Sequence, residues 1–571
     1  MKKLLYLLKD YKKESVLAPF FKLLEALLEL LVPLIMVILI DRGIETQNYG
    51  IVRQMCLLLV CLAAVGLAFS VTAQYFAAKA AMGFGAKLRQ TLFSRLLSIG
   101  YTQIDQLGSS AMITHMTSDI NQIQTGVNMV LRLFLRSPVI VFGAAIMAFT
   151  IDIKSAIIFV IVIPLMSAVV FLVLMKTIPM YRRVQKALEK VLNLTRENLT
   201  GIRVLRAFHK EKDEIASFAQ ANQTYFTQQV KAGQISVLLN PLTFLLINGA
   251  LIVLIRTGAV QTNVGTITQG QLVALISYMS QILVELVKLA NLVVTMTKAL
   301  ACAGRVSTAM EQESEPRQLE DIHPDRSKTH SPYLEFDHVS LTYEGAQEES
   351  LTDIHFSVNE GETIGILGGT GSGKTSLVNL IPRFYEATHG SIRLCGVDIR
   401  RLDSHDLRLK VGIVPQKVVL FKGSIETNLK MGKEDATEEE MKEALTIAQA
   451  MEFLGSEAEV LKQKVSAGGL NFSGGQRQRL TIARALVRKP EILILDDSSS
   501  ALDYLTDVAL RRALKGAKAR ATFLISQRHT AVRGADRILV LEDGKMVGFG
   551  THEELLLGCS VYREIVGEVV R

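Results

Sequence analysis

Residues Asn471–Leu486 read NFSGGQRQRLTIARAL. Ser473 precedes a strongly helical segment, and serine is a preferred residue for capping a helix N-terminus. The two glycines that follow, Gly474 and Gly475, cost helix stability, so a plain capped helix does not explain them. Bare backbone amides at the start of a helix bind anions. The stretch from Ser473 to Gln476 is therefore predicted to be an anion-binding helix start.

A phosphate-binding pattern lies upstream of this stretch. The segment GGTGSGKT fits G-x-x-x-x-G-K-[ST], between an apolar strand pattern, ETIGILG, and a helical one, SLVNLIPRF. In this pattern, glycines let backbone amides close around phosphate oxygens, Lys374 reaches the β- and γ-phosphates, and Thr375 ligates Mg²⁺. The predicted ATP-binding residues of the loop are Gly368, Gly369, Thr370, Gly371, Ser372, Gly373, Lys374, Thr375 and Ser376.

A second strand ends in a carboxylate. Ile492–Asp496 reads ILILD, which is typical of a buried strand that presents an aspartate to the shell of a nucleotide-bound Mg²⁺. Apolar strands that end in Asp are common, so this signal is weak alone. Together with the phosphate-binding loop it predicts an α/β ATPase domain with Asp496 at the metal.

The first half of the chain has a different composition. Uncharged apolar runs crowd residues 18–298, and six segments approach the length of roughly 20 residues that a membrane-spanning helix needs. Backbone that is unpaired in lipid is too costly, so each segment must be helical. The third segment is the weakest. The six lie at about 20–40, 55–78, 135–151, 156–175, 234–255 and 270–295.

The loops between these segments predict the orientation of the chain. The long loops, 80–134 and 177–233, are the basic ones, so they and both termini are expected on the cytoplasmic side of the cell membrane. Their apolar residues recur at helical spacing, so the spans are expected to continue as helices into the cytoplasm. The basic, amphipathic start predicts an interfacial helix. The net charge of +8 is assigned to this topology and not to nucleic-acid binding.

Two carboxylates lie inside the first span. At 1.5 Å per residue, Glu29 falls roughly in the middle of the bilayer, with Glu25 one turn away. Intramembrane carboxylates are costly and usually face a cavity or a partner. Glu25 and Glu29 are therefore candidates for binding a cationic substrate. The alternative is a structural pair, with Lys22 for Glu25 or with Lys288 of the last span.

The polar stretch 305–332 contains three prolines, which is typical of a linker. The predicted organisation is a transmembrane domain at 1–304, a linker at 305–332 and a nucleotide-binding domain at 333–571. The five cysteines show no metal-binding spacing and are expected to be free thiols.

The motifs together carry a family resemblance. SGGQ, placed after the phosphate-binding loop and before ILILD, resembles the signature of the ATP-binding cassette (ABC) family. A membrane domain followed by the cassette resembles the half-size exporters of that family, and the match covers nearly the whole chain. The resemblance implies that two cassettes dimerise head to tail around ATP and Mg²⁺. Ser473, Gly474, Gly475 and Gln476 then complete the site of the partner chain.

The resemblance implies further roles at matching positions. Tyr343 would stack on adenine, and Gln416 would sit between the Mg²⁺ site and the membrane domain as a metal and catalytic residue. Ser500–Asp503 would cross the dimer interface. Short coupling helices near Thr102–Leu107 and Thr200–Val204 would press on the cassettes.

The chain departs from the family pattern at the catalytic positions. Asp497 stands where the family usually has a Glu that orients the attacking water, and Gln527 stands where it has a His; His529 follows two residues later. Ala467 occupies a position that is often Glu. Asp is shorter than Glu by one bond, roughly 1.5 Å, and a misplacement of about 1 Å costs on the order of 10²-fold in rate. Gln cannot carry a positive charge to the transition state. The chain is therefore expected to bind ATP well and to hydrolyse it slowly.

This pattern resembles the degenerate-site subunit of bacterial heterodimeric multidrug exporters. The leading interpretation is an ATP-hydrolysing subunit that exports hydrophobic or amphiphilic compounds, with most hydrolysis at the site that the partner completes. Alternatives are a homodimer with two slow sites, a lipid or peptide exporter, and an ATP-gated channel or sensor without sustained turnover. The six spans exclude a soluble ATPase that acts on DNA. Import is disfavoured because no part of the chain would bind solute outside the cell.

Overall fold

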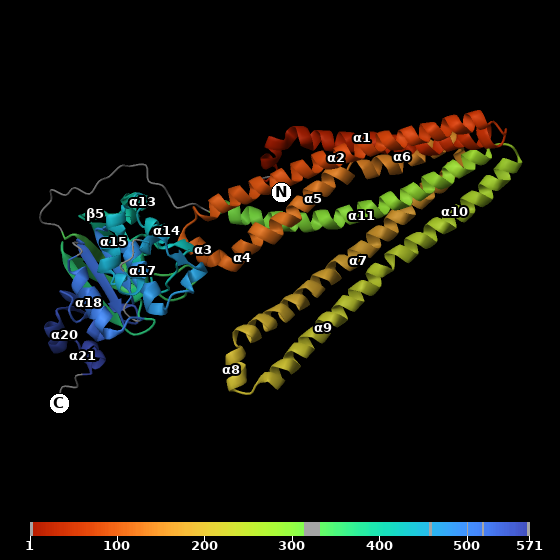
Figure 1. Ribbon diagram of the computed structural model, residues 1–571. Helices are drawn as coiled ribbons and strands as arrows, with labels where there is room; N and C mark the ends of the chain where they lie inside the picture. Colours follow the sequence, from red (N-terminus) through yellow and green to blue (C-terminus); the bar gives the residue numbers. More distant parts are fainter. Residues whose placement is uncertain (1–3, 313–331, 456–458, 499–500, 517–518, 568–571) are drawn as a thin grey trace. The chain divides into compact units, whose positions relative to one another are not determined.

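The structure is a computed structural model that describes residues 4–312, 332–455, 459–498, 501–516 and 519–567. It divides into two compact units, Met1–Leu97 with Leu107–Gln312, and Ser98–Gln106 with Glu313–Arg571 (Figure 1). Ser500, predicted to lie at a dimer interface, and most of the predicted linker fall outside the described residues.

Six helical stretches of the first unit are long and apolar enough to cross a membrane, as predicted. Two of them, α2 and α7, have 48 residues each. At 1.5 Å per residue such a helix is roughly 70 Å long, more than twice the thickness of the hydrocarbon core. The predicted extension of the spans as helices is confirmed. The helices are α1 (Lys12–Ile38), α2 (Tyr49–Leu96), α4 (Ser109–Thr114), α5 (Ile120–Leu133), α6 (Arg136–Ile151), α7 (Ile153–Thr200), α8 (Ile202–Ala207), α9 (Glu211–Val237), α10 (Leu239–Asn263) and α11 (Gln269–Glu311).

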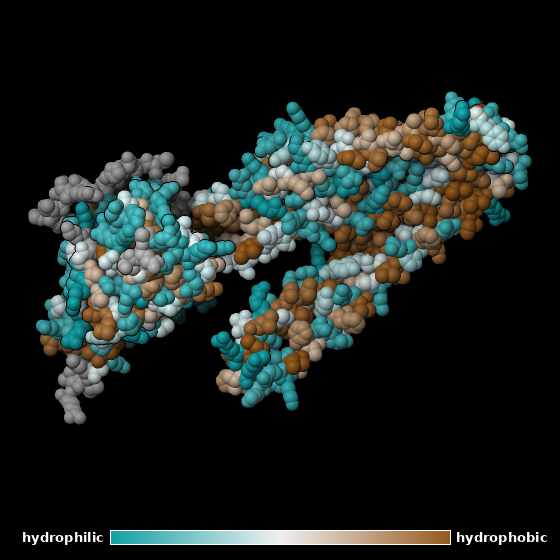
Figure 2. Space-filling view, in the orientation of Figure 1, coloured by the Kyte–Doolittle hydropathy of each residue, from teal (hydrophilic) through white to brown (hydrophobic). Residues whose placement is uncertain are grey.

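The outer faces of these helices are apolar. Figure 2 shows brown, hydrophobic side chains over much of the surface of the membrane unit. Leu57 and Leu67 of α2, for example, are 67% and 65% exposed. Water does not tolerate such a surface over a large area, whereas lipid does. The exposure pattern therefore agrees with membrane-spanning helices.

The third span is interrupted. α5 ends at Leu133 and α6 begins at Arg136, so Phe134 and Leu135 separate two helices. Pro138 lies in the first turn of α6, where its missing N–H removes no intrahelical bond. The segment predicted at 135–151 is thus only the second half of the span. Because of the interruption, Arg136 is the first residue of α6.

The boundary predicted for the linker is wrong at its start. Residues 305–311 continue α11, because Val306 and Ala309 are buried and Arg305 donates from Nε to Asp119 Oδ2 at 3.0 Å. The segment is polar in composition, but its two buried apolar residues, Val306 and Ala309, are three positions apart, as on one face of a helix. Near the N-terminus of the chain, Leu4 and Leu7 of the predicted interfacial helix are buried in the same core cluster as Val306.

The second unit is built on a ten-stranded sheet in the order β5-β4-β1-β2-β12-β11-β3-β10-β9-β6. The strands β11, β3, β10, β9 and β6 are parallel neighbours, which confirms an α/β domain. Their bounds are β1 (Leu334–Leu341), β2 (Leu351–Val358), β3 (Glu362–Gly368), β4 (His389–Leu394), β5 (Val397–Asp398), β6 (Val411–Val414), β9 (Ile492–Asp496), β10 (Ala521–Ser526), β11 (Arg537–Glu542) and β12 (Lys545–Gly550). A separate pair joins β7 (Gly423–Ser424) to β8 (Lys464–Val465).

Helices pack around the parallel strands, whose residues are almost continuously apolar. Ile364 of β3, Ile494 of β9 and Phe523 of β10 are fully buried, as expected for strands that are covered on both faces. The helices are α12 (Lys374–Leu380), α13 (Ser404–Lys410), α14 (Ile425–Lys430), α15 (Glu438–Ile447), α16 (Met451–Leu454), α17 (Gly474–Leu486), α18 (Tyr504–Leu514), α19 (His529–Val532), α20 (His552–Gly558) and α21 (Ser560–Val566).

A short segment between α2 and α4 clusters with the cassette. It contains α3 (Tyr101–Leu107), whose Tyr101 ring lies 4.3 Å from the Phe384 ring. The Tyr385 hydroxyl donates to Asp105 Oδ2 at 2.5 Å. Short helices therefore occur at both positions where coupling helices were expected, α3 and α8. The coupling role itself stays a prediction.

Candidate functional site

Four neighbouring parallel strands bring the predicted nucleotide residues to one edge of the sheet. The phosphate-binding loop follows β3, Gln527 follows β10, Asp497 follows β9, and Gln416 follows β6. Ligands of open α/β sheets bind at the carboxyl ends of the strands. These residues line a cavity of about 640 Å³ with Lys374 and Thr375. The sequence motifs therefore meet in space as expected.

The loop conformation requires glycine at two positions. Gly371 has φ +85° and Gly373 has φ +92°, in the left-handed region that other residues rarely adopt. A Cβ at Gly373 would also lie 2.9 Å from the carbonyl oxygen of Ser350. These glycines let the backbone turn tightly between β3 and α12. Such a turn can present amide groups to phosphate oxygens.

The Lys374 side chain is 8% exposed and contacts only oxygens of its own loop among the described residues. Its Nζ donates to Gly368 O at 2.9 Å, to Gly369 O and, at 3.3 Å, to Ser372 Oγ. Burial lowers the pKa of this ammonium, against the opposing influence of Asp496 and Asp497. A buried cation with neutral partners is well placed to bind an anionic ligand.

Thr375 and Asp496, which were predicted to bind Mg²⁺, lie next to one another. The Thr375 hydroxyl donates to Asp496 Oδ2 at 2.9 Å, and Gln416 lines the same cavity. Burial raises the pKa of Asp496, and the neighbouring Asp497 charge raises it further. Hydroxyl, amide and carboxylate oxygens are the ligands that Mg²⁺ prefers, and a divalent cation would relieve the unfavourable burial of Asp496. The residues present therefore fit Mg²⁺.

The two departures from the family pattern also line the cavity. Asp497 has φ +48°, and its N–H donates to Ile525 O at 3.0 Å, which fixes its backbone against β10. The Gln527 carboxamide oxygen accepts from the Thr370 hydroxyl at 3.3 Å. His529 begins α19 and is not among the lining residues. β10 ends at Ser526, so His529 lies beyond the strand.

Tyr343 lies beside the loop but lines a different cavity. Its hydroxyl donates to Ser376 Oγ at 2.9 Å, and its ring meets the Tyr385 ring edge-on at 5.0 Å. It lines a cavity of about 490 Å³ with Tyr101 and Phe384. Its proposed stacking on adenine therefore stays a prediction.

The signature lies apart from the nucleotide cavity of its own chain, because none of Ser473–Gln476 lines it. Ser473 caps α17: Gln476 N donates to Ser473 Oγ at 3.3 Å, and Ser473 N donates to Gln476 Oε1 at 2.9 Å. A Cβ at Gly475 would lie 2.8 Å from the carbonyl oxygen of Ala501, so packing requires this glycine. No sequence motif indicates this packing reason. Ser473 and Gly474 are exposed and available to another molecule.

Acidic residues that were not among the predicted site residues also line the cavity wall. Glu348, Glu349 and Asp543 line it from the loops before β2 and between β11 and β12. No motif marks them, since only the pairing of β12 with β2 brings these loops to the phosphate-binding loop.

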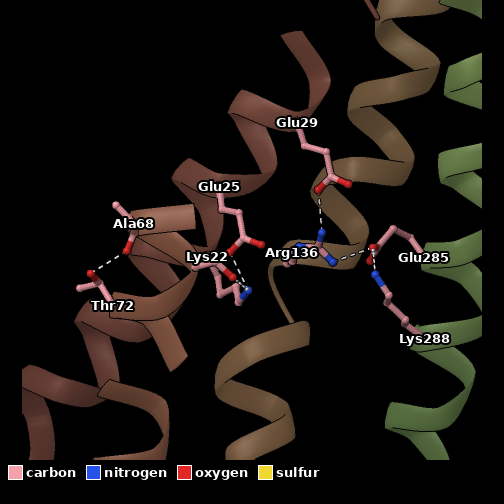
Figure 3. A network of polar contacts seen from close by, with 9 residues as sticks. Lys22, Glu25, Glu29, Ala68, Thr72, Arg136, Glu285 and Lys288 are labelled. Atoms are coloured by element: carbon pink, nitrogen blue, oxygen red, sulfur yellow. Dashed lines mark hydrogen bonds and ion pairs between the residues drawn. The ribbon is translucent and has the colours of Figure 1, made fainter. Parts of the chain in front are cut away.

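In the membrane unit, the predicted carboxylates belong to a network of ion pairs. Glu25 Oε2 accepts from Lys22 Nζ at 2.6 Å, which is the structural pair given as an alternative. Glu29 does not pair with Lys288. Its carboxylate accepts from Arg136 Nη2 at 2.6 Å, because the interruption of the third span brings Arg136 to α1. Figure 3 shows Arg136 between Glu29 and Glu285.

Glu285 is the centre of this network and was missed. It is 2% exposed and accepts from Arg136 Nη1 at 2.6 Å, Ser137 Oγ at 2.7 Å and Lys288 Nζ at 2.8 Å. The signal that identified Glu29, a carboxylate inside an apolar run, applies equally to Glu285 in the last span. The network therefore joins α1, α6 and α11 through mutually compensating charges, of which Arg136 and Glu285 are buried.

Comparisons with known proteins agree with this architecture. A family model described as the ABC transporter transmembrane region matches residues 15–286, and one described as ABC transporter matches residues 351–500. The uncharacterized ABC transporter ATP-binding protein YfiB of Bacillus subtilis (strain 168) is 34% identical, over 99% of this chain and 98% of that protein. The ATP-dependent lipid A-core flippase of Chromobacterium violaceum is 28% identical, over 99% and 96%.

A second protein of Bacillus subtilis (strain 168), YgaD, is named for multidrug export and is 31% identical, over 99% of this chain and 98% of that protein. The solved structure of a bacterial Atm1-family ABC exporter with ATP bound shares the fold with a TM-score of 0.83 at 22% identity, covering 98% of this chain and 99% of that chain. With its membrane unit, its nucleotide cavity and its separate signature helix, the chain belongs to the ABC transporter family as a half-size, ATP-hydrolysing exporter.

Proposed function

We propose that this chain is one subunit of a heterodimeric exporter of hydrophobic or amphiphilic compounds, and that its own nucleotide cavity hydrolyses ATP slowly. Half-size ABC exporters function as dimers, and the exposed signature of this chain is suited to a partner's site. The observation that carries the proposal is the composition of the cavity. Lys374, Thr375 and Asp496 line it as binding groups, while Asp497 and Gln527 occupy the catalytic positions.

The slow rate follows from what these two side chains can do. The Asp497 carboxylate reaches about 1.5 Å less far than that of Glu from a backbone fixed by Ile525. Gln527 is neutral and already accepts a hydrogen bond from Thr370. Mg²⁺, when held by Thr375 and Asp496 with Gln416, would offset the charge that develops on the phosphates. The chain therefore retains the groups that bind ATP and lacks a well-placed base.

The experiment compares two variants in the membrane complex with the partner. Asp497→Asn is expected to leave appreciable ATP turnover. Ser473→Ala is expected to lower turnover at least about 10-fold, because a hydrogen bond to a charged group contributes about 1.5–3 kcal/mol. The matched control is Ser424→Ala, which removes the same kind of cap from α14 but lies in neither site.

The outcomes separate the possible assemblies. A homodimer with two identical sites loses all turnover with Asp497→Asn alone. If that variant silences hydrolysis while Ser473→Ala is harmless, the assigned roles are reversed. The purified chain without a partner is expected to hydrolyse little ATP, because one cassette cannot close a site, and vigorous turnover by it would contradict an obligate partner.

We propose the orientation that the loop charges predict, with both termini on the cytoplasmic side of the cell membrane. A cysteine introduced at Asn48, between α1 and α2, is then accessible from outside. Its labelling by an impermeant thiol reagent added to whole cells checks this orientation, and labelling of a cysteine at Asn222 instead would reverse it.

For the substrate, we propose that Glu29 contacts positively charged groups. Its side chain is 40% exposed and, among the described residues, accepts only from Arg136, whereas that of Glu285 is 3% exposed and accepts from three donors. A substrate cation that replaces Arg136 at Glu29 leaves Arg136 paired with Glu285. No buried charge is then left without a partner, so the exchange avoids the largest electrostatic penalty.

Transport of dyes tests this assignment. Glu29→Gln is expected to reduce the transport of a cationic dye at least several-fold more than that of a neutral dye of similar size. Glu25→Gln is the matched control, because Glu25 is paired with Lys22 and its side chain is only 16% exposed. Equal losses for both dyes would assign Glu29 a structural role.

A further inference from the structure

Three side chains on the sheet of the second unit lie close enough to hold one metal ion. His338 belongs to β1, and Asp353 and His355 belong to β2. One ligand atom from each lies within 4.8 Å of the other two. In the part of the chain that the structure describes, this is the one such group of His, Cys, Asp or Glu side chains. It is formed by residues other than those of the nucleotide cavity.

The local strand geometry brings the three side chains together. β1 and β2 are antiparallel, and their register shifts between Phe336 and Val339, so that His338 lies in a bulge. His338 and Asp353 both have a positive φ, +49° and +52°, at the irregular positions of the two strands. His355 follows Asp353 by two positions and therefore lies on the same face of β2.

The contacts bring ligand atoms together without saturating them. His338 Nδ1 lies 2.5 Å from Asp353 Oδ1, and the His338 and His355 rings stack at 5.2 Å. The side chains of His338 and Asp353 are 67% and 62% exposed. The contact between His338 and Asp353 is exposed to solvent, so small rotations of these side chains toward a common ion cost little. The exposure also lets an ion enter without unfolding the strands.

The chemistry of the set selects a class of ion. Two imidazoles and one carboxylate match the ligands that Zn²⁺, Ni²⁺ and Cu²⁺ use in proteins, whereas Mg²⁺ prefers oxygen ligands alone. Three protein ligands leave the remaining coordination positions to water. We propose that His338, Asp353 and His355 form a binding site for a divalent transition-metal ion of the zinc class, distinct from the Mg²⁺ site.

The test uses the full chain purified in detergent without nucleotide. Titration calorimetry with Zn²⁺ is expected to show one stoichiometric site, and Cu²⁺ bound in its place is expected to give an electron paramagnetic resonance signal split by two imidazole nitrogens. His338→Ala and His355→Ala are each expected to weaken binding at least about 10-fold, since even the loss of a supporting partner costs a metal site that much.

The matched control is His405→Ala, an exposed histidine of the same unit outside the cluster. It is expected to bind Zn²⁺ as the unaltered chain does. All three histidines are exposed, and a thermal unfolding measurement confirms that each variant is folded. Binding by His338→Ala and His355→Ala equal to that of His405→Ala would place the ion elsewhere and overturn the proposal. Failure of the unaltered chain to bind one equivalent would overturn it as well.

Discussion

Buried charge is arranged in opposite ways in the nucleotide cavity and in the membrane network. Among the described residues, Lys374 donates only to neutral oxygens of its own loop. Burial lowers the pKa of Lys374 and raises the pKa of Asp496, so the charged form of each is disfavoured. Arg136, in contrast, meets two carboxylates, and Glu285 meets three donors. Charges left without opposite partners indicate a site that a ligand completes. Charges that neutralise one another where they are buried, as at Glu285, indicate a structural joint between helices.

The largest effect expected from this difference is on the stability of the membrane unit. Arg136→Met leaves the buried Glu285 with one cation in place of two, and loss of one partner from a buried ion pair costs about 3–5 kcal/mol. Lys288→Met is the comparison, since it also removes one cation from Glu285, but the Lys288 side chain is 39% exposed and Arg136 stays in place, so a smaller loss of stability is expected. Thermal unfolding in detergent, followed by circular dichroism, measures both losses. Equal losses would show that Arg136 and Lys288 do not differ in this way.

A smaller effect of the opposite kind is expected at the nucleotide cavity. Lys374→Met should weaken ATP binding about 10- to 100-fold, because a hydrogen bond to a charged group contributes about 1.5–3 kcal/mol. The variant should unfold at the same temperature as the unaltered chain or higher, since an ammonium is no longer buried. Photolabelling of the purified chain with azido-ATP measures binding. Lys433→Met, which alters a half-buried pair with Glu440 away from the nucleotide cavity, should leave binding unchanged.

The smallest expected effect depends on pH. Burial raises the pKa of Asp496, with a further contribution from Asp497, so the folded chain holds this proton more tightly than the unfolded chain. Ionisation of Asp496 therefore costs stability as the pH rises through its folded pKa. Asp496→Asn should gain about 0.5–2 kcal/mol near pH 7 without nucleotide or Mg²⁺. The gain should vanish below about pH 4, where the carboxyl is protonated in both states.

Glu362 provides a control of opposite sign. Burial alone would raise its pKa, but hydrogen bonds from Arg537 and the Asn359 N–H lower it. Its ionised form therefore stabilises the fold at neutral pH, and this contribution disappears as the pH falls through the lowered pKa. Glu362→Gln should lose stability at pH 7 and show no loss in strong acid. A gain from Glu362→Gln at pH 7, or a loss from Asp496→Asn, would contradict the distinction between ligand sites and structural pairs.

The sequence predicts groups that are positioned by neighbouring residues, and it misses groups whose partners are distant in the chain. Local motifs mark Lys374, Thr375 and Asp496, because each of these residues is positioned by a strand, a turn or the first turn of a helix. Arg136 and its partners carry no motif, since Glu29 and Glu285 lie 107 and 149 residues away in the chain. Helical periodicity finds the spans but cannot say which polar side chains of different spans face one another.

The same limit explains smaller differences. The Tyr343 ring meets the Tyr385 ring while its hydroxyl reaches Ser376, and this arrangement depends on side-chain packing that no sequence pattern records. The end of α11 was missed because its last turns are polar in composition, although Val306 and Ala309 are buried. Gly475 was assigned to anion binding alone, and its close approach to Ala501 became evident only from the fold.

The interruption at residues 134–135 divides the third span between two core clusters. Ile123 and Val127, before it, are buried in one core cluster with Val306; Val141 and Ala144, after it, are buried in another with Tyr278. Because main-chain hydrogen bonding is already reduced at the start of α6, bending there costs less than bending within a continuous helix. We therefore expect the two halves of the third span to tilt relative to one another at residues 134–135. The ion pairs of Arg136 lie next to this point, where such a tilt displaces side chains least.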